Sequence, residues 1–301
     1  MGEKMNTKDL EYFKQLILQK NFSKVAKFFN VSQPTITTAI KRLEAEFGAK
    51  LIIRDRVHNV LTVTPSGTQL AEHAEIILRE LEISHQEINN LTEQQIVLGL
   101  PPIIENHYFP MVAAKLSATG LLPNITTVEG GSIWLRDAVR DGRVDMTLLG
   151  SVDPLSYRSL LAEEFDRQPF SIFVSKDHPL AKRKRIYFSE LRHENFVFFT
   201  SNFVHNTAFN RLTRRNHFRP NIVFRSNDTH VLMKLIAQNI GVGFLTNVVD
   251  HYRSDVVRLE LLDDEQPEFI TSIVYRTSHI LTPAQIKLLD VLHSTLESDA
   301  D

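Results

Sequence analysis

Short polar side chains that could hydrogen-bond to DNA are concentrated between residues 32 and 42 of this 301-residue chain. Apolar residues recur there at helical spacing and would form one face that packs inward. It consists of Ile36, Ala39, Ile40 and Leu43. The side chains left on the outer face are Gln33, Thr35, Thr37, Thr38, Lys41 and Arg42. Amide, hydroxyl and cationic groups of this kind donate to phosphates and base edges, which favours a helix that reads a DNA groove.

A preceding helix and a tight turn would position the helix that begins after Ser32. The preceding helix has an apolar face formed by Phe22, Val25, Ala26 and Phe29. The pattern breaks at residues 30–31, after which Ser32 can cap the next helix. Pro34 in the first turn costs no intrahelical hydrogen bond. Two consecutive amphipathic helices also occur in all-α proteins that bind no DNA, so the pair alone leaves both interpretations open.

The residues after the helix pair predict a two-stranded wing. Residues 51–64 comprise an apolar strand, a polar turn at 55–59 and a β-branched strand. Basic or ionisable side chains near its edges and tip are Arg54, Arg56 and His58. Residues 1–64 contain eleven Lys or Arg and six Asp or Glu, a net charge of +5, and the rest of the chain carries −7. This asymmetry fits phosphate binding by the N-terminal segment alone.

This N-terminal segment resembles the DNA-binding domain of LysR-type transcriptional regulators. The matching stretches are MNTKDLEYFKQL, VSQPTIT, IKRLEAEFGAKL and the exit Val63-Thr64…Gly67. The resemblance implies a winged helix-turn-helix over residues 1–64. Thr38 departs from the family, which often has Arg there, so a base or phosphate contact is either absent or replaced by Lys41 or Arg42. The predicted DNA-binding residues are Ser32, Gln33, Pro34, Thr35, Thr37, Thr38, Lys41, Arg42, Arg54 and Arg56.

Residues 65–92 predict a single long helix with a heptad seam. The seam consists of Leu70, Ala74, Ile77, Leu81, Ser84, Ile88 and Leu91. A free helix would leave this seam in water, so a partner is expected. One alternative is packing against the chain's own C-terminal region. The family resemblance favours an antiparallel coiled coil between two subunits, so that a dimer reads two half-sites.

Residues 95–301 predict alternating strands and helices, which indicates α/β layers with largely parallel sheets. The resemblance implies a two-lobed effector-binding region with the fold of periplasmic solute-binding proteins. Lobe one would comprise residues 95–163 and 268–301, and lobe two residues 164–267. The chain would change lobes near residues 161–166 and return near 265–269.

Four loops after predicted strands would converge on the cleft between these lobes. Ligands of such folds bind beyond the carboxyl ends of strands and at helix N-termini. The candidate effector-binding residues are Pro101, Pro102, Ile103, Ser132, Thr200, Ser201, Asn202 and Thr246. Each alone is more often an ordinary cap or turn residue, so only their convergence indicates a site.

The first of these loops departs from the family. Pro101-Pro102 stands where members that bind small acids often have Ser or Thr, and a proline pair lacks backbone donors. We expect Arg136 or His205 to supply a cation instead.

Other classes of protein lack support in the sequence. The chain has no cysteine, no Gly-x-Ser-x-Gly motif, no P-loop and no apolar run long enough for a membrane span. No cofactor or metal is expected. An enzyme fused to a DNA-binding head, such as a biotin ligase that represses, would show a Gly/Arg-rich adenylate loop. An exported binding protein would not carry the wing and recognition helix.

The sequence therefore predicts a cytoplasmic, bacterial-type transcriptional regulator that is not an enzyme. A small organic acid or amino acid between the lobes would control it allosterically. The expected partners are double-stranded DNA, further copies in a homodimer or homotetramer, the effector and RNA polymerase, with no membrane. The N-terminal segment also resembles that of activators of malolactic fermentation genes, which suggests L-malate as the effector.

Overall fold

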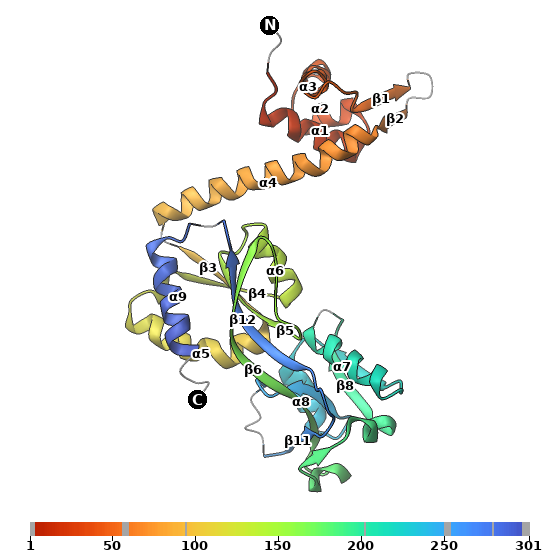
Figure 1. The fold of residues 1–301 in the computed structure, drawn as a ribbon, viewed down its shortest axis with the longest axis vertical. Helices are drawn as coiled ribbons and strands as arrows, with labels where there is room; N and C mark the ends of the chain where they lie inside the picture. The colour runs from red at the N-terminus through yellow and green to blue at the C-terminus, as the bar shows by residue number, and fades with distance from the viewer. Residues whose placement is uncertain are drawn as a thin grey trace. The chain divides into compact units, whose positions relative to one another are not determined.

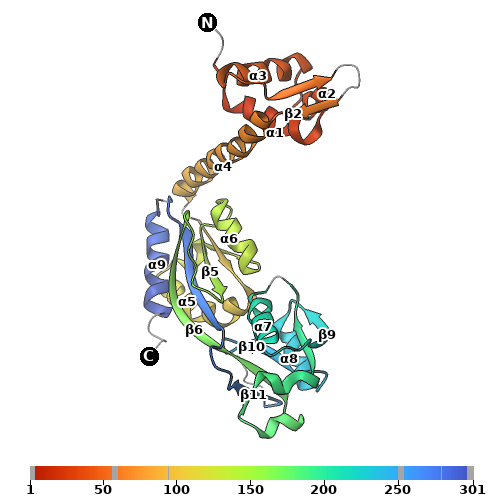
Figure 2. The same cartoon turned by 45° about the vertical axis from the view of Figure 1, so that its right-hand side comes forward.

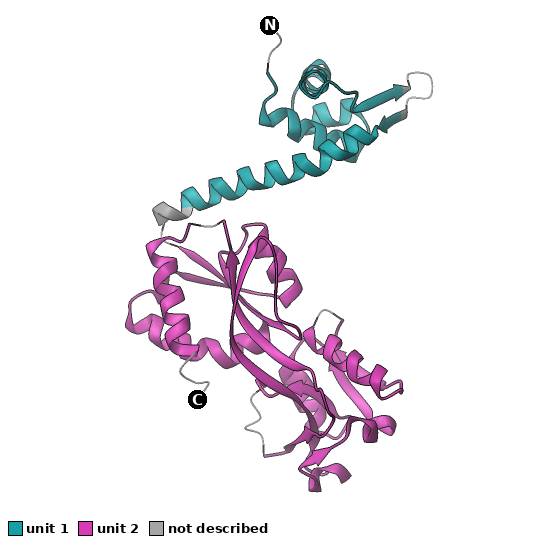
Figure 3. Cartoon of the chain, in the orientation of Figure 1, with its two compact units in different colours: residues 1–89 teal, residues 90–301 magenta. Residues whose placement is uncertain are grey.

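The computed structural model describes residues 4–55, 60–93, 95–201, 203–249, 254–278 and 280–296. The chain divides into two compact units, residues 1–89 and 90–301 (Figure 3).

Unit 1 is a winged helix-turn-helix followed by a long helix, which confirms the predicted fold. Its elements are α1 (Thr7–Gln19), α2 (Phe22–Phe28), α3 (Gln33–Glu46), β1 (Ile52–Asp55), β2 (Val60–Val63) and most of α4 (Pro65–Glu93), which crosses the unit boundary after residue 89 (Figure 1). The first three helices begin at side chains that accept a backbone N–H. These caps are Asn6, Asn21 and Ser32. Asn30 adopts a left-handed backbone with φ of 54°, which permits the tight turn between α2 and α3.

The core of unit 1 contains the apolar face predicted for the recognition helix α3. Its four residues are buried with Leu10, Phe13 and Leu16 of α1. The wing strands pair antiparallel, from Ile52 opposite Val63 to Asp55 opposite Val60. Predictions for Arg56 and His58 concern the wing turn, which lies outside the described residues.

We call the winged helix-turn-helix, which comprises α1–α3, β1 and β2, the head. The first turns of α4 pack into its core. Leu70 and Ala74 are buried in the head core. Gly67 lies so close to the wing that a Cβ there would be 2.2 Å from the Leu51 carbonyl oxygen. The packing of the head therefore extends beyond the predicted boundary at residue 64. Further along the predicted seam, Ile77, Leu81 and Ile88 are 45%, 39% and 64% exposed.

Unit 2 contains two lobes, as predicted. In lobe one, β3 (Ile96–Leu100) lies between β4 (Ile125–Glu129) and β5 (Met146–Ser151), parallel to both. β12 (Glu268–Arg276) pairs antiparallel with β5. The helices of this lobe are α5 (Pro102–Ala118), α6 (Ser132–Arg140) and α9 (Pro283–Leu296). Parallel strands followed by helices place the ends of β3 and β4, and the starts of α5 and α6, at the same edge.

A single long strand, β6 (Leu160–Ser175), connects the two lobes. It lies beside β12 from Leu160 to Pro169, and beside β10 and β11 from Phe170 to Ser175 (Figure 2). The lobes therefore change after Pro169, not near residue 163. Proline lacks a backbone donor, so it suits the point at which the partner strand changes.

Lobe two mixes parallel and antiparallel pairs, so the prediction of largely parallel sheets is correct only in part for it. Its strands are β7 (Arg185–Ile186), β8 (Asn195–Phe199), β9 (Asn221–Ser226), β10 (Gly243–Thr246) and β11 (Val256–Leu261). β10 and β11 run antiparallel to β6, whereas β8 and β9 are parallel to each other. The helices are α7 (Val204–Arg215) and α8 (Thr229–Ala237). A buried core rich in aromatic rings lies beneath α7. It includes Phe170, Phe188, Phe196, Phe198, Phe199, Phe209 and Phe244.

Candidate functional site

The first turn of α3 presents hydroxyl groups that are already organised. Ser32 Oγ accepts the Thr35 backbone N–H at 3.3 Å and lies 2.8 Å from Thr35 Oγ1. Thr37 Oγ1 donates to the Gln33 carbonyl oxygen at 3.1 Å. The exposed candidates on this helix and its cap are Ser32, Pro34, Thr35, Thr38 and Lys41, and the half-buried ones are Gln33 and Thr37. The face that the sequence assigned to DNA is thus largely open to solvent.

Arg42 requires a correction, because its guanidinium binds a buried carboxylate of α1. Its Nη2 lies 2.6 Å from Asp9 Oδ1, and its Nε donates to Asp9 Oδ2 at 3.0 Å. The Asp9 side chain is fully buried and that of Arg42 is 18% exposed. A buried carboxylate is strongly unfavourable without a partner. Arg42 therefore stabilises the packing of α3 against α1, and the prediction that it binds DNA is corrected.

Arg54 is exposed on β1 of the wing. Its guanidinium carbon lies 5.2 Å from the centroid of the Phe22 ring, within the range of a cation–π interaction. This contact holds the cation beside the start of α2.

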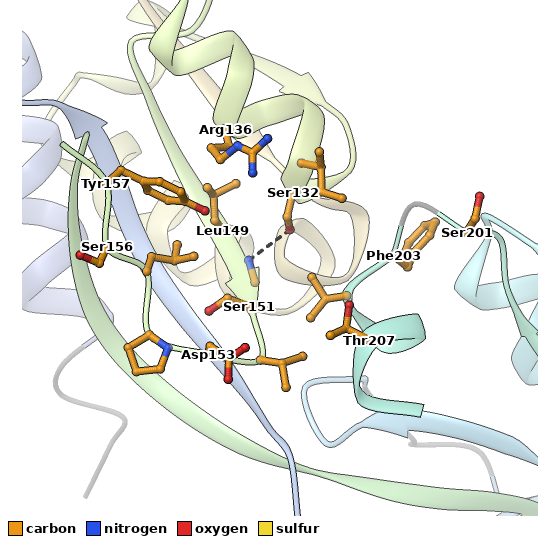
Figure 4. Close-up of a pocket in the computed structure, with 16 residues that line it drawn as sticks. Ser132, Arg136, Leu149, Ser151, Asp153, Ser156, Tyr157, Ser201, Phe203 and Thr207 are labelled. Carbon is orange, nitrogen blue, oxygen red and sulfur yellow. Dashed lines mark hydrogen bonds between the residues drawn. The ribbon is translucent and has the colours of Figure 1, made fainter. Parts of the chain in front are cut away.

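In unit 2, a cavity of about 430 Å³ lies between the two lobes. We call it the outer cavity and define it by Ser132, Arg136, Ser151, Asp153, Tyr157 and Thr207. Figure 4 shows α6 and the end of β5 on one side, with Phe203 and Thr207 at the start of α7 facing them. Lobe one thus contributes most of the polar groups, and lobe two closes the opposite wall.

Arg136 is the cation of the outer cavity. Its Nε and Nη2 both donate to Asp137 Oδ1, at 3.0 and 2.9 Å, and its guanidinium carbon is 5.8 Å from the Tyr157 ring centroid. Burial lowers its pKa, but hydrogen bonds with Tyr157 and Asp137 outweigh that effect and the pKa is raised. Arg136 is therefore charged at any physiological pH and can bind an anion.

Two serines of the outer cavity differ in their bonding. Ser132 Oγ accepts the Gly150 backbone N–H at 3.2 Å, which ties the start of α6 to β5 (Figure 4). Ser151 is 7% exposed, and its Oγ has no hydrogen-bond partner within the described parts of the chain. The Ser151 hydroxyl can therefore donate to a ligand.

An ion pair joins the lobes beside the outer cavity. Arg211 of α7 contacts both carboxylate oxygens of Asp153, which follows β5, and its Nη1 lies 2.9 Å from Oδ1. Hydrogen bonding from Arg211 holds the pKa of Asp153 below its usual range. Both side chains are substantially exposed, so we expect the pair to contribute less than about 1 kcal/mol.

A smaller cavity of about 20 Å³ adjoins the outer one and shares Ser132, Phe203 and Val204 with it. We call it the inner cavity. Its other lining residues are Pro101, Ile103, Gly131, His205 and Phe269. The N-caps of α5, α6 and α7 all lie in its wall. They are Pro101, Gly131 and Phe203, and none of these side chains can accept a hydrogen bond. Helix starts without side-chain caps leave backbone donors for another acceptor.

His205 occupies the wall of the inner cavity as a neutral ring. It is 1% exposed and packs against Phe170, Phe199 and Phe269. Its Nε2 accepts the Thr246 backbone N–H at 3.3 Å, so the ring proton is on Nδ1. Burial lowers the pKa of His205 to about 3. The expectation that His205 supplies a cation is therefore wrong.

The predicted effector residues separate into two groups. Ser132 and Ser201 line the outer cavity, and Pro101, Ile103 and Ser132 line the inner one. Residues lining neither of these two cavities are Pro102, Thr200 and Thr246. Asn202 lies outside the described residues.

Thr200 and Thr246 were predicted to bind the effector, but their hydroxyl groups are bonded within lobe two. The Thr200 hydroxyl donates to Asn227 Oδ1, and its carbonyl oxygen accepts from Asn206 Nδ2 at 2.5 Å. Thr246 is fully buried, with its hydroxyl near the Val248 backbone N–H. Both residues therefore stabilise lobe two.

The sequence interpretation missed several residues of the outer cavity. They are Ser151, Asp153, Tyr157, Phe203 and Thr207. The first three belong to the segment SVDPLSY, which begins at the last residue of β5, and its position at the end of a buried strand was an available signal. No helix of the described residues is long and apolar enough to cross a membrane. Within the same residues, no three His, Asp or Glu side chains gather as a metal site would require.

Comparisons with known proteins agree with this architecture. Residues 7–68 match the family model of the bacterial regulatory helix-turn-helix protein, lysR family, and residues 89–297 match the LysR substrate binding domain. The malolactic fermentation system transcriptional activator of Lactococcus lactis subsp. lactis is 31% identical over 289 residues, which cover 96% of this chain and 98% of that protein.

Solved structures show the same fold at lower sequence identity. A Corynebacterium glutamicum OxyR C206 mutant has a TM-score of 0.58 at 19% identity and covers 99% of this chain and 95% of its own. The effector binding domain of QuiR in complex with shikimate has a TM-score of 0.60 at 14% identity, covering 68% of this chain and 97% of its own. The two family matches, together with the winged head and the two-lobed cleft, show that this chain belongs to the LysR family of transcriptional regulators.

Proposed function

We propose that the cleft of this regulator binds a small organic acid, and that binding changes how the protein engages DNA. The observation that carries the proposal is the convergence of Arg136 and three helix starts without side-chain caps on two adjoining cavities. Helix N-termini and guanidinium groups both favour negative charge.

L-malate is the first acid to test. The Lactococcus relative is named for malolactic fermentation, and it is similar over nearly the whole chain. We therefore propose that this chain controls genes for the use of malate, with a dicarboxylate as effector. Arg136 would bind one carboxylate in the outer cavity.

We propose that α3 enters the major groove of DNA. Gln33 and Thr37 would read base edges, because amide and hydroxyl groups near a helix N-terminus reach them. Arg54 and Arg56 in the wing would contact phosphates or the minor groove. The remaining contacts of the first turns would come from Ser32, Pro34, Thr35, Thr38 and Lys41.

The exposed stripe on α4 supports a dimer. Ile77, Leu81 and Ile88 continue one helical face beyond the head core, and such a face is stabilised by a second helix. A homodimer, or a homotetramer built from two dimers, would place its heads on separate half-sites. The acid would alter their spacing, and thereby contact with RNA polymerase. Because the target is chromosomal DNA, we place the protein in the bacterial cytoplasm.

Thermal unfolding with a panel of acids tests this proposal. L-malate, succinate and L-lactate are compared with sodium chloride at equal ionic strength, because DNA affinity depends on salt. We expect one of the acids to raise the melting temperature and to change the affinity for a DNA site selected from random sequence. If none of the acids does either, the cleft does not bind this class of ligand.

A further inference from the structure

His205 presents a buried donor to the inner cavity. Its Nε2 is occupied by the Thr246 backbone N–H, so Nδ1 carries the proton. No acceptor for that proton occurs among the described residues. Buried polar groups in native proteins rarely lack a partner, because leaving a donor desolvated and unbonded is unfavourable. The orphaned Nδ1–H therefore indicates that something else completes this position.

The surroundings of His205 favour an oxygen atom as that missing partner. The inner cavity is bounded by apolar Ile103 and Phe269 and by the starts of α5, α6 and α7. First-turn backbone donors and the His205 Nδ1–H are all neutral, and together they favour a partial or full negative charge. At about 20 Å³ the cavity has room for one group the size of a water molecule.

Phe203 separates this position from the outer cavity. Its ring stacks on Phe199 with centroids 4.3 Å apart, and it lines both cavities. Ser132 and Val204 also line both cavities, so these three residues form the boundary between them. A ligand that reached both cavities would have Arg136 toward one end and His205 toward the other.

We infer that the inner cavity binds a carboxylate oxygen of the effector, which accepts a hydrogen bond from Nδ1–H of His205. This inference rests on the proposed function and assigns the ends of the ligand. One carboxylate places an oxygen atom in the inner cavity at the boundary with Phe203, and a second acceptor group lies against Arg136 in the outer cavity. The ligand class is therefore a short acid with oxygen functions at both ends. His205 is a specificity-determining residue that recognises the buried end without carrying a charge.

Two substitutions at His205 test this assignment in the full-length protein, with L-malate and succinate as probes. His205→Phe keeps a planar ring and removes Nδ1–H. We expect calorimetry to show affinity at least about tenfold weaker, as for loss of a hydrogen bond to a charged group. His205→Gln keeps one donor and one acceptor, and should recover part of the affinity. Thr213→Val, on the same helix α7 but outside both cavities, should bind as wild type does.

Nuclear magnetic resonance of the wild-type protein provides a second readout that needs no substitution. We expect the imidazole Nδ1–H signal of His205 to shift downfield and exchange more slowly with water when the acid saturates. An unchanged signal, or equal affinity in wild type and a folded His205→Phe variant, would overturn the assignment and leave water as the partner of His205. If wild type binds neither acid, the proposed function fails together with this inference.

Discussion

The helices of the head and the helices around the cleft begin in different ways. In the head, α1, α2 and α3 start at side chains that satisfy their own first-turn donors. Around the cleft, α5, α6 and α7 start at Pro101, Gly131 and Phe203, which cannot. The first turns of the three head helices thus have a side-chain cap within the chain, whereas the three helices around the cleft have none among the described residues. Substitutions in the head should therefore alter stability, assembly or DNA affinity, and those in the cleft should alter ligand affinity.

The largest effect is expected at the exposed stripe of α4. Replacing Ile77 and Leu81 together by Glu would bury charges against the partner helix, at a cost of at least about 4 kcal/mol, or a thousandfold in the dimer dissociation constant. Light scattering of the double variant should report monomers. Replacing the exposed Glu72 and Glu82 of the same helix by Gln should leave the dimer intact. A dimer that survives both Glu substitutions would mean that the stripe has another function.

Arg42→Ala should destabilise the head by about 3 kcal/mol, because it removes the cation that pairs with the buried Asp9 carboxylate. Amide hydrogen exchange in α1 and α3 measures this loss separately from unit 2. The neighbouring exposed variant Lys41→Ala should exchange as wild type does and bind DNA more weakly. Equal amide protection in the two variants would contradict our assignment of Arg42 to the interior of the head and of Lys41 to its DNA-facing surface.

Arg136→Ala should weaken binding of the acid by about 1.5–3 kcal/mol, the range for a hydrogen bond to a charged group. DNA binding without the acid should not change, because the head is a separate unit. Arg140→Ala, one turn further along α6 and outside the cavity, is the matched control. Thr200→Val should also bind normally, since the Thr200 hydroxyl is bonded to Asn227. A loss in the Arg140 variant as large as in the Arg136 variant would contradict the placement of the ligand.

The smallest effect is expected for Asp153→Asn, which weakens the ion pair between the lobes by less than about 1 kcal/mol. Because Arg211 lowers the pKa of Asp153 in the folded state, the stabilisation is present at neutral pH. It is lost as the pH falls through that lowered pKa. Wild type and variant should therefore differ slightly in melting temperature at pH 7 and converge in acid. A difference that persists or grows in acid would show that the pair does not act through this charge.

Sequence reasoning succeeded where interactions are local. The cap at Ser32, the inward face of α3 and the strands of the wing depend on neighbours within a few residues, and all were predicted. Arg42 was misassigned because its partner Asp9 lies 33 residues away on another helix. Helical spacing shows that Arg42 leaves the apolar face of its own helix, but it does not show which other helix covers it.

The same limit explains the errors in the cleft. His205 is neutral because it is surrounded by Phe170, Phe199 and Phe269, which come from three separate strands. The helical spacing of His205 with Ala208, Phe209 and Leu212 does place it on the inward face of α7, but this spacing does not show which strands cover that face. Position after a strand correctly indicated Ser132, but it could not distinguish Ser201 in the cavity wall from Thr200, whose hydroxyl turns away to Asn227.

The most direct test of the account is calorimetric titration of L-malate into the full-length protein with and without its selected DNA site. If the cleft and the head are coupled, DNA must change the affinity for the acid by the same factor by which the acid changes the affinity for DNA. We expect both factors to agree and to lie between about fivefold and a hundredfold. Identical affinity for the acid with and without saturating DNA would contradict the account, because the cleft would then bind a ligand without controlling the head.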